Sequence, residues 1–451
     1  MTPLTASDFS ETALAACAFF LLLIPLAGAG LALINTGLGR SRSAAHSMLA
    51  SLCVFAVAAG AYFVCGFAWQ GFPGGPSHVI WANGKAWDWL GGERLFLRGL
   101  AFGGSDKALL AACMGIFSAG LAALIPLGSG ADRWRLRAAC SSTALLAGLT
   151  FPLFAHWVWG GGWLARLGVN YGLGRGFLDA GGAGTIQAVG GLTALSVAWI
   201  LGPRRGKYSL EGMPAVIPGH NAVFVLLGCL LALVGWLGLN CAGAILFAGM
   251  GFGRAGLVGI NTILGGGAGG LAAAGMTRWR YGRPDVSLSA NGFVSGLAAT
   301  SASCPFVAPA AALFIGIVAG ALAALSVEWF ELRLAIDDPG GAVSVHALGG
   351  LWGLLALGMF ARFPGPAAYA QGHIVGTTAV SIPGQFLAQL VGVATLLGFI
   401  LPLTYGLNWL LDKLWGQRVD AEGERQGLDV YELGSSAYPE FVLHTEEFTQ
   451  Q

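Results

Sequence analysis

Two polar pairs in the chain share one spacing: an aspartate is followed eight residues later by a side chain that can relay hydrogen bonds. The first pair is Asp179 and Gln187, and the second, 159 residues further on, is Asp338 and His346. An aspartate at a helix start caps free backbone N–H groups. An imidazole can take and pass a proton, whereas an amide only donates and accepts hydrogen bonds. The pairs therefore point to hydrogen-bond or proton relay.

Both pairs lie in a repeated segment. Residues 179–192 and 338–351 are identical at eight of fourteen positions, with three further conservative pairs. Chance similarity between two Gly/Ala-rich helices is the alternative. The shared aspartate and the polar residue eight positions later argue against it, because neither is a small apolar residue of the kind that such helices share by composition. An internal repeat predicts a repeated architecture, and in a membrane protein paired repeats point to the transport site.

The composition indicates what positions these residues. The chain is 55% hydrophobic and 10% charged, with 73 glycines and a mean hydropathy of +0.70. Soluble chains carry about 25% charged residues, so most of this surface must face lipid or other helices. A net charge of +1 gives no reason to expect a nucleic-acid partner. The eight cysteines show no CxxC spacing and lie mostly in apolar runs, which favours gap-filling over disulfides or metal binding.

Apolar runs of membrane length predict an all-α polytopic protein with eleven transmembrane helices. The N-terminus lacks a basic start and an obvious cleavage site, so we expect the first run to be retained. We expect two inverted five-helix repeats at 12–201 and 222–360, a final helix at 385–411, and a cytoplasmic tail at 412–451 after a transmembrane domain at 1–411. The predicted spans are 12–34, 47–69, 108–127, 138–159, 183–201, 222–239, 256–274, 288–302, 306–327, 342–360 and 385–411.

Basic residues set the predicted orientation. With the loop after the first span inside, fifteen of the 23 lysines and arginines fall on the inner side. The positive-inside rule then places the N-terminus outside and the C-terminus inside. The fifth and tenth spans are then antiparallel. In each of these two helices, the eight residues after the aspartate extend about 12 Å into the membrane. Gln187 and His346 should therefore approach the bilayer midplane from opposite faces, where polar groups are usually functional. Glycines beside each residue would let the helices approach closely.

Several motifs, in order along nearly the whole chain, give it a family resemblance. The sequence resembles the ammonium transporter (Amt/Mep/Rh) superfamily. The segments that carry the resemblance are Ala155-His-Trp-Val-Trp-Gly-Gly-Gly162, Asp179-Ala-Gly-Gly182, Gly235-Trp-Leu-Gly-Leu-Asn240, Asn261-Thr262, Gly282-Arg-Pro-Asp285, Asn291-Gly292, Asp337-Asp-Pro339, Val345-His-Ala-Leu-Gly-Gly350 and Gly427-Leu-Asp-Val430.

The resemblance implies a homotrimer in the cell (inner or plasma) membrane, with one narrow, mostly apolar pore per subunit. It implies an external aromatic site that recruits ammonium and a deeper pair of pore histidines. A bare ammonium ion in hydrocarbon pays a large desolvation penalty that neutral ammonia avoids. Aromatic faces offset about 0.5–2 kcal/mol of that penalty per contact.

The resemblance also assigns residues. Trp159 matches the recruitment tryptophan, with an interfacial belt tryptophan as the alternative. Phe117 matches the outer gate phenylalanine, or else is a core aromatic, and Asp179 matches the structural aspartate near that site. His346 matches the second pore histidine, and Trp236 is also assigned to the pore. His156 and His220 stay unassigned.

Departures from the family pattern cluster along the predicted pathway. Gln187 stands at the first pore histidine, Leu239 at the second gate phenylalanine, and Gly243 at the recruitment serine. About eight additional residues, around 170–177, separate Trp159 from Asp179. In the tail, Leu433 and Ser435 replace an expected His and Glu, which weakens the inference that a nitrogen-regulatory P-II protein binds there.

Two hypotheses follow. One is an ammonium channel with an altered proton relay, and the other is an ammonium receptor that conducts little and signals through its tail. A signalling domain beyond Gln451 would favour the receptor, and the tail ends without an obvious stop signal. An enzyme is not expected, because no nucleophile–base pair, phosphate loop or metal spacing is present, and no cofactor is expected.

Overall fold

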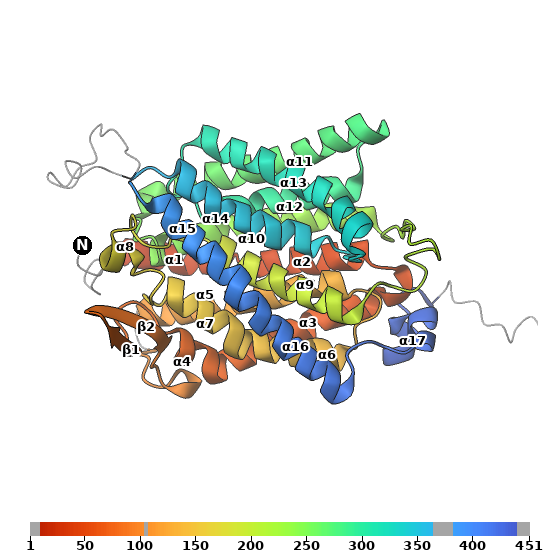
Figure 1. Cartoon of the computed structure of the whole chain (residues 1–451), viewed down its shortest axis with the longest axis horizontal. Helices are drawn as coiled ribbons and strands as arrows, with labels where there is room; N and C mark the ends of the chain where they lie inside the picture. The colour runs from red at the N-terminus through yellow and green to blue at the C-terminus, as the bar shows by residue number, and fades with distance from the viewer. Residues whose placement is uncertain (1–9, 103–106, 364–381, 440–451) are drawn as a thin grey trace, which may run out of the picture.

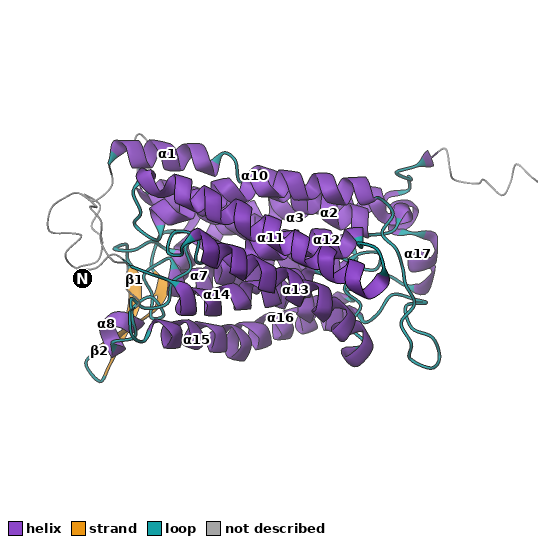
Figure 2. Ribbon diagram, turned by 90° about the horizontal axis from the view of Figure 1, so that it is seen from above, coloured by secondary structure: helices purple, strands orange, loops and turns teal. Residues whose placement is uncertain are grey.

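The computed structural model describes residues 10–102, 107–363 and 382–439. Long helices lie side by side in one bundle, and shorter elements gather at its two ends (Figures 1 and 2). The end at which α1 begins also carries α8 and a β-hairpin, and α17 lies at the opposite end. The last residues of the predicted tail, 440–451, lie outside the described residues.

The first five predicted spans correspond to helical segments. These are Glu11–Leu38 (α1, Glu11–Leu21, and α2, Pro25–Leu38), Ser41–Gln70 (α3, Ala44–Ala61, and α4, Phe67–Gln70), Lys107–Gly130 (α5), Leu136–Val158 (α6, Leu136–Leu145, and α7, Phe151–Val158) and Ala183–Leu201, which ends in α9, Val189–Leu201.

The second set follows after a loop. Its segments are Ala222–Leu246 (α10), Ala255–Tyr281 (α11), Val286–Ser301 (α12), Pro309–Leu334 (α13) and Val343–Phe360, which ends in α14, Gly349–Phe360. The last span, Gln385–Trp415, holds α15 (Gln385–Thr395) and α16 (Leu401–Trp415). The short helices are α8 (Leu167–Tyr171), α17 (Ala421–Gln426) and α18 (Leu428–Leu433).

Within the described residues, ten helical segments are long and apolar enough to cross a membrane. The remaining predicted span is α12, a 16-residue helix that packs against α11 and α13. The mostly helical, multi-span architecture is thus confirmed, whereas the count of eleven crossings stays a prediction.

The sixth span continues seven residues beyond its predicted end at Leu239. Asn240 interrupts the apolar run, but its side chain is fully buried and its Nδ2–H donates to Thr262 Oγ1 at 2.9 Å. An amide whose N–H group is bonded to a neighbouring helix is compatible with a helix interior, although Asn240 Oδ1 has no partner among the described residues. As a result α10 ends only at Leu246, which brings Phe247 to its C-terminal end.

A β-hairpin departs from the all-α prediction. Strands β1 (Ser77–Ala82) and β2 (Lys85–Gly91) pair antiparallel around Asn83 and Gly84. Both turn residues have positive φ, of 51° and 72°, which is the geometry that Asn-Gly favours in a two-residue hairpin. The dipeptide was the sequence signal for this element, and hydropathy alone does not detect it.

The two copies of the repeat begin with the same backbone irregularity. A π-helical turn opens each helix, at Ala183–Ala188 in the first copy and at Val343–Leu348 in the second. Such turns are rare and frequently lie at functional sites. The repeat seen in the sequence is therefore also a repeat in backbone conformation.

Candidate functional site

The two polar residues of the repeat meet inside the bundle. The Nδ1–H of His346 donates to Gln187 Oε1 at 2.7 Å, and both side chains are buried, with exposures of 5% and 0%. An amide oxygen accepts hydrogen bonds only, so the imidazole proton lies on Nδ1 and Nε2 keeps its lone pair. Gln187 Nε2 is buried and has no hydrogen-bond partner among the described residues. The pair thus presents the free N–H groups of Gln187 Nε2 as donors and His346 Nε2 as an acceptor.

Two glycines make this meeting possible. A Cβ at Gly191 would lie 2.2 Å from the backbone nitrogen of Ala347, and one at Gly350 would lie 2.3 Å from the carbonyl oxygen of Ala183. Both are far below contact distance, so no larger residue fits either position without moving a backbone. Gly191 and Gly350 are themselves 159 residues apart, which makes the crossing symmetric. The close approach predicted from the flanking glycines is present.

Each aspartate of the repeat caps its π-helical turn. Asp179 Oδ2 accepts hydrogen bonds from the backbone N–H groups of Gly184 (2.9 Å) and Thr185 (2.7 Å) and from Thr185 Oγ1 (2.9 Å). Its Oδ1 is buried without a partner among the described residues. A buried carboxylate oxygen without a donor is unfavourable on its own, which makes this position able to gain from a cation or a hydrogen-bond donor.

Trp159 lies against Asp179 rather than at a lipid surface. Its indole Nε1–H donates to the carbonyl oxygen of Asp179 at 2.7 Å, and its exposure is 2%. The ring of Phe247 stacks on it with a centroid distance of 4.3 Å and an interplanar angle of 3°. Phe151 approaches edge-on at 6.3 Å. The structure therefore brings Trp159 and Asp179 together and adds Phe247, which sequence reasoning missed.

Phe117 is placed elsewhere. It lies on α5 with its ring 6.5 Å from that of Phe55 on α3. The ring that covers Trp159 comes from the end of α10 and not from α5. The next residue on α5, Ser118, is fully buried, and its hydroxyl has no partner in the described part of the chain. Phe117 is half-buried, and its assignment as the outer gate phenylalanine, or else as a core aromatic, stays a prediction.

The two remaining predicted residues lie on α10. Trp236 and Leu239 are both fully buried, and Trp236 Nε1–H donates to Ser301 Oγ at 3.2 Å. A few residues further on, Gly243 faces the turn before the first π-helical segment, where a Cβ would lie 2.1 Å from the carbonyl oxygen of Ala180. The missing side chain at Gly243 lets α10 approach this turn closely.

The additional residues before Asp179 are held by two glutamines of α15. Gln385 exchanges hydrogen bonds with Arg175 N and Gly176 O, and Gln389 does so with Leu178 N and O, at 2.8–3.0 Å. Each amide thereby completes the backbone hydrogen bonding of an irregular segment, as buried polar backbone requires. These contacts fix the chain that leads into Asp179.

His156, which the sequence left unassigned, ties the hairpin to the bundle. Its Nδ1 lies 2.7 Å from the carbonyl oxygen of Gln70 and its Nε2 lies 2.9 Å from Asp88 Oδ1 on β2. Both partners are acceptor oxygens, so each ring nitrogen of His156 lies at hydrogen-bonding distance from an acceptor. Trp159 follows three residues after His156, at the C-terminal end of α7. The contacts of His156 with Gln70 and Asp88 therefore fix the last helical turn before Trp159.

The opposite end of the bundle carries a buried charge cluster. Arg204 donates to both carboxylate oxygens of Asp337, at 2.9 and 3.0 Å, and to Asp132 Oδ2 at 3.0 Å. The fully buried Arg133 donates to the carbonyl oxygen of Asp337 at 2.8 Å. Burial alone would raise the pKa of Asp337, but the hydrogen bonds and charge of Arg204 and the charge of Arg133 lower it to about 2.

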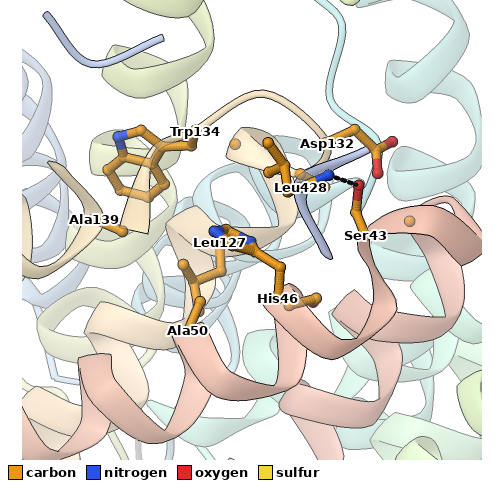
Figure 3. A pocket seen from close by; sticks show the side chains of 12 residues that line it. Ser43, His46, Ala50, Leu127, Asp132, Trp134, Ala139 and Leu428 are labelled. Atoms are coloured by element: carbon orange, nitrogen blue, oxygen red, sulfur yellow. Dashed lines mark hydrogen bonds between the residues drawn. The ribbon is translucent and has the colours of Figure 1, made fainter. Parts of the chain in front are cut away.

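The C-terminal segment docks on this end. Asp429 accepts hydrogen bonds from the backbone N–H groups of Ala45 and His46, and Glu432 contacts His46 Nε2 at 2.8 Å. The N–H of Leu428 donates to Ser43 Oγ at 3.4 Å beside a small cavity between this segment and α3, α5 and α6 (Figure 3). His220, also unassigned, contacts Tyr438 Oη through Nε2 at 3.1 Å. The described part of the tail is therefore held against the helix bundle by side-chain contacts.

A bundle of membrane-length helices in which two repeated segments meet at a buried polar pair is typical of a polytopic membrane protein of the transporter class. The chain belongs to the Ammonium Transporter Family, whose family model matches residues 14–438. It is a family of transporters and not of enzymes.

Individual relatives agree with this assignment. The ammonium transporter Amt2 of Archaeoglobus fulgidus is 35% identical over 94% of this chain and 87% of its own length. The ammonium transporter Amt2 of Haloferax mediterranei is 31% identical over 92% and 87%. Among solved structures, a Sensor Amt Protein superposes with a TM-score of 0.81 at 27% identity, covering 93% of this chain and 98% of that one. Mep2 of Saccharomyces cerevisiae, at 24% identity and a TM-score of 0.77, shows the fold alone.

Proposed function

We propose that this protein is a channel-type ammonium transporter whose pore has lost one of two titratable groups. The observation that carries the proposal is the buried hydrogen bond of 2.7 Å between His346 and Gln187 at the crossing of the two repeated helices. In the proposal the outer end of the path is formed by Trp159 and Asp179, and Trp236 and Leu239 line the path between them and the polar pair.

The polar pair suits a neutral ligand. Ammonia carries a lone pair and N–H groups, so it can accept from Gln187 Nε2–H and donate to His346 Nε2. Rotating the amide and moving the imidazole proton to Nε2 leaves the pair with one donor and one acceptor again. An ammonium ion has no lone pair for the amide N–H. The pair therefore favours ammonia over ammonium whichever way it is arranged.

What Gln187 cannot do is hold a proton. Two histidines would provide the same hydrogen bonds and a second site that ionises near neutral pH, whereas an amide does not ionise. Proton passage must then rely on His346 and water, or the cation passes whole with poorer selectivity. We expect currents that are smaller or less selective than those of a relative with two pore histidines.

The second candidate is an ammonium receptor. It is favoured by the likeness to a Sensor Amt Protein, which extends over 98% of that chain. The replacements at Gln187, Leu239 and Gly243 would impair conduction while leaving Asp179 and Trp159 in place. The docked tail, through Asp429 and Glu432, would then carry the signal.

The remaining expectations belong to the same proposal. We infer eleven membrane crossings in two inverted repeats with the N-terminus outside, a transmembrane domain at 1–411 and a cytoplasmic tail from 412. We also infer a homotrimer in the inner or plasma membrane. The aromatic, hairpin-bearing end then faces outside, and the arginine cluster around Asp337 faces the cytoplasm. A P-II protein or a downstream signalling domain would bind at the tail.

The test is electrical. Purified protein in proteoliposomes receives an ammonium pulse and, separately, a potassium pulse, while ammonium binding is measured on the same preparation. A small or poorly selective ammonium current supports the altered channel. Binding without current supports the receptor. A robust current selective for ammonium would contradict the loss of relay at Gln187.

A further inference from the structure

The cation-binding face of Trp159 is occupied by a residue of the same chain. Phe247 lies parallel to the indole at 4.3 Å between ring centroids, and Trp159 is only 2% exposed. A cation held between two rings needs about 3.5 Å of contact on each side, or about 7 Å between the rings. The observed spacing of 4.3 Å leaves no room for an ammonium ion between the two rings. If Phe247 were absent, an ammonium ion could bind over the open face of Trp159, within about 6 Å of the ring centroid.

The position of Phe247 follows from Gly243. The N–H of Phe247 donates to the carbonyl oxygen of Gly243 at 2.9 Å, which places the ring one helical turn beyond that glycine. The absence of a side chain at Gly243 lets α10 approach Ala180, next to Asp179. The same residue that lacks the recruitment hydroxyl therefore brings an aromatic ring over Trp159.

The backbone after Phe247 can allow this ring to move. Helix α10 ends at Leu246, and residues 247–251 form an irregular connection to the turn at Phe252–Arg254. Gly249 in this connection has a φ of +62°, a conformation that glycine adopts without strain. Phe247 itself is half-buried, unlike Trp159. Its ring can leave the indole by rotation without opening the helix bundle.

We propose that Phe247 is a lid on the external ammonium site, stacked on Trp159 in the unliganded protein and displaced when ammonium binds. The inference rests on the proposed function, because it takes Trp159 and Asp179 as that site. Displacement uncovers the indole face of Trp159, whose Nε1–H is bonded to the carbonyl oxygen of Asp179. Phe247 thus sets the affinity of the site, since every bound ion must first separate two stacked rings.

Ammonium affinity of matched variants tests the lid. Phe247→Ala removes the ring, and Phe252→Ala removes an exposed ring from the same external connection. We expect Phe247→Ala to tighten ammonium binding by roughly 2- to 12-fold, the factor equivalent to an aromatic pair of about 0.5–1.5 kcal/mol. Phe252→Ala should leave the affinity unchanged. Phe247→Leu, which still covers the indole, should give an intermediate value, and it replaces the alanine variant if that variant does not fold.

Trp159→Leu separates the two proposals. If the unmodified protein binds ammonium and Trp159→Leu does not, the external site stands. Unchanged or weaker binding by Phe247→Ala would then overturn the lid alone and make the ring a wall of the site. If neither the unmodified protein nor Phe247→Ala binds ammonium, the external site is wrong and the lid with it.

Discussion

The two copies of the repeat use one backbone design at opposite ends of the bundle, but they treat their aspartates differently. Asp179 and Asp338 each cap a π-helical turn, and a glycine crossing follows each. Asp338 has both oxygens bonded, to the N–H of Val343 and to Ser129 Oγ. Asp179 keeps Oδ1 without a partner among the described residues, next to Trp159.

Under the proposed function, this difference separates the end around Asp179, which we call the binding end, from the end around Asp337 and Asp338, which we call the structural end. Around the second copy every carboxylate oxygen of Asp337 and Asp338 has a donor, and Arg204 and Arg133 fix the loops. Around the first copy, Asp179 Oδ1 has no donor among the described residues. The neighbouring side chains there are the aromatic rings of Trp159, Phe247 and Phe151, and not arginines. The proposed function therefore assigns ligand binding to the end with the unpartnered carboxylate oxygen and a structural role to the other end. Substitutions at the two ends should accordingly affect different properties.

The largest effect is expected at the structural end. Asp337→Asn removes the charge that neutralises Arg204 and Arg133, and breaking a buried pair costs about 3–5 kcal/mol. Thermal unfolding in detergent should show a much lower melting temperature. Glu422→Gln, which removes an exposed pair with Arg425, is the control and should leave the melting temperature unchanged. An equally stable Asp337→Asn protein would show that the cluster does not hold this end together.

The crossing between the copies should be nearly as sensitive. Gly191→Ala places a methyl group against the backbone of Ala347, and overpacking of this kind costs about 1–3 kcal/mol or more. Gly267→Ala is the matched control, because a Cβ there has nothing within 4 Å and alanine favours a helix by about 1 kcal/mol. Melting temperatures should therefore move in opposite directions. The same direction for both would contradict the close crossing.

These two ends also show what the sequence could and could not reveal. The meeting of Gln187 and His346 was predictable, because equal spacing from a helix start fixes depth in two antiparallel helices. The positions of the spans followed from apolar runs in the same way, but their ends did not, since α10, α11 and α13 each continue seven residues past the predicted end. The stacking of Phe247 on Trp159 was not predictable, since it depends on how far α10 continues past Asn240 and how closely Gly243 lets it approach.

The next largest effect is expected from acidification, which should lower the stability that Asp337 contributes to the folded state. The folded-state pKa of Asp337 is about 2, below its ordinary value of 3.8. A lowered pKa stabilises the folded state above the ordinary value and loses that contribution as pH falls toward 2. The loss amounts to about 2 kcal/mol. Melting temperatures measured from pH 6 to pH 2.5 should fall more steeply for the unmodified protein than for Asp337→Asn. Parallel curves would argue against this assignment.

The smallest stability effect, with the largest functional one, is expected at the binding end. Asp179→Asn can keep a cap through its amide oxygen, so we expect a stability loss of only about 1 kcal/mol. Without the charge, ammonium binding should weaken strongly. Asp338→Asn is the matched substitution at the other copy and should leave ammonium affinity largely unchanged. Equal losses of affinity in both variants would remove the distinction between the two ends.

The most direct test of the account is the ratio of ammonium to potassium current in proteoliposomes for the unmodified protein and Gln187→His. Restoring a second imidazole beside His346 supplies the missing proton site without changing the hydrogen-bond pattern of the pair. We predict that the ratio rises in Gln187→His, and that His346→Gln, which pairs two amides, does not show this rise. A ratio that is already high in the unmodified protein and unaffected by Gln187→His would contradict the account.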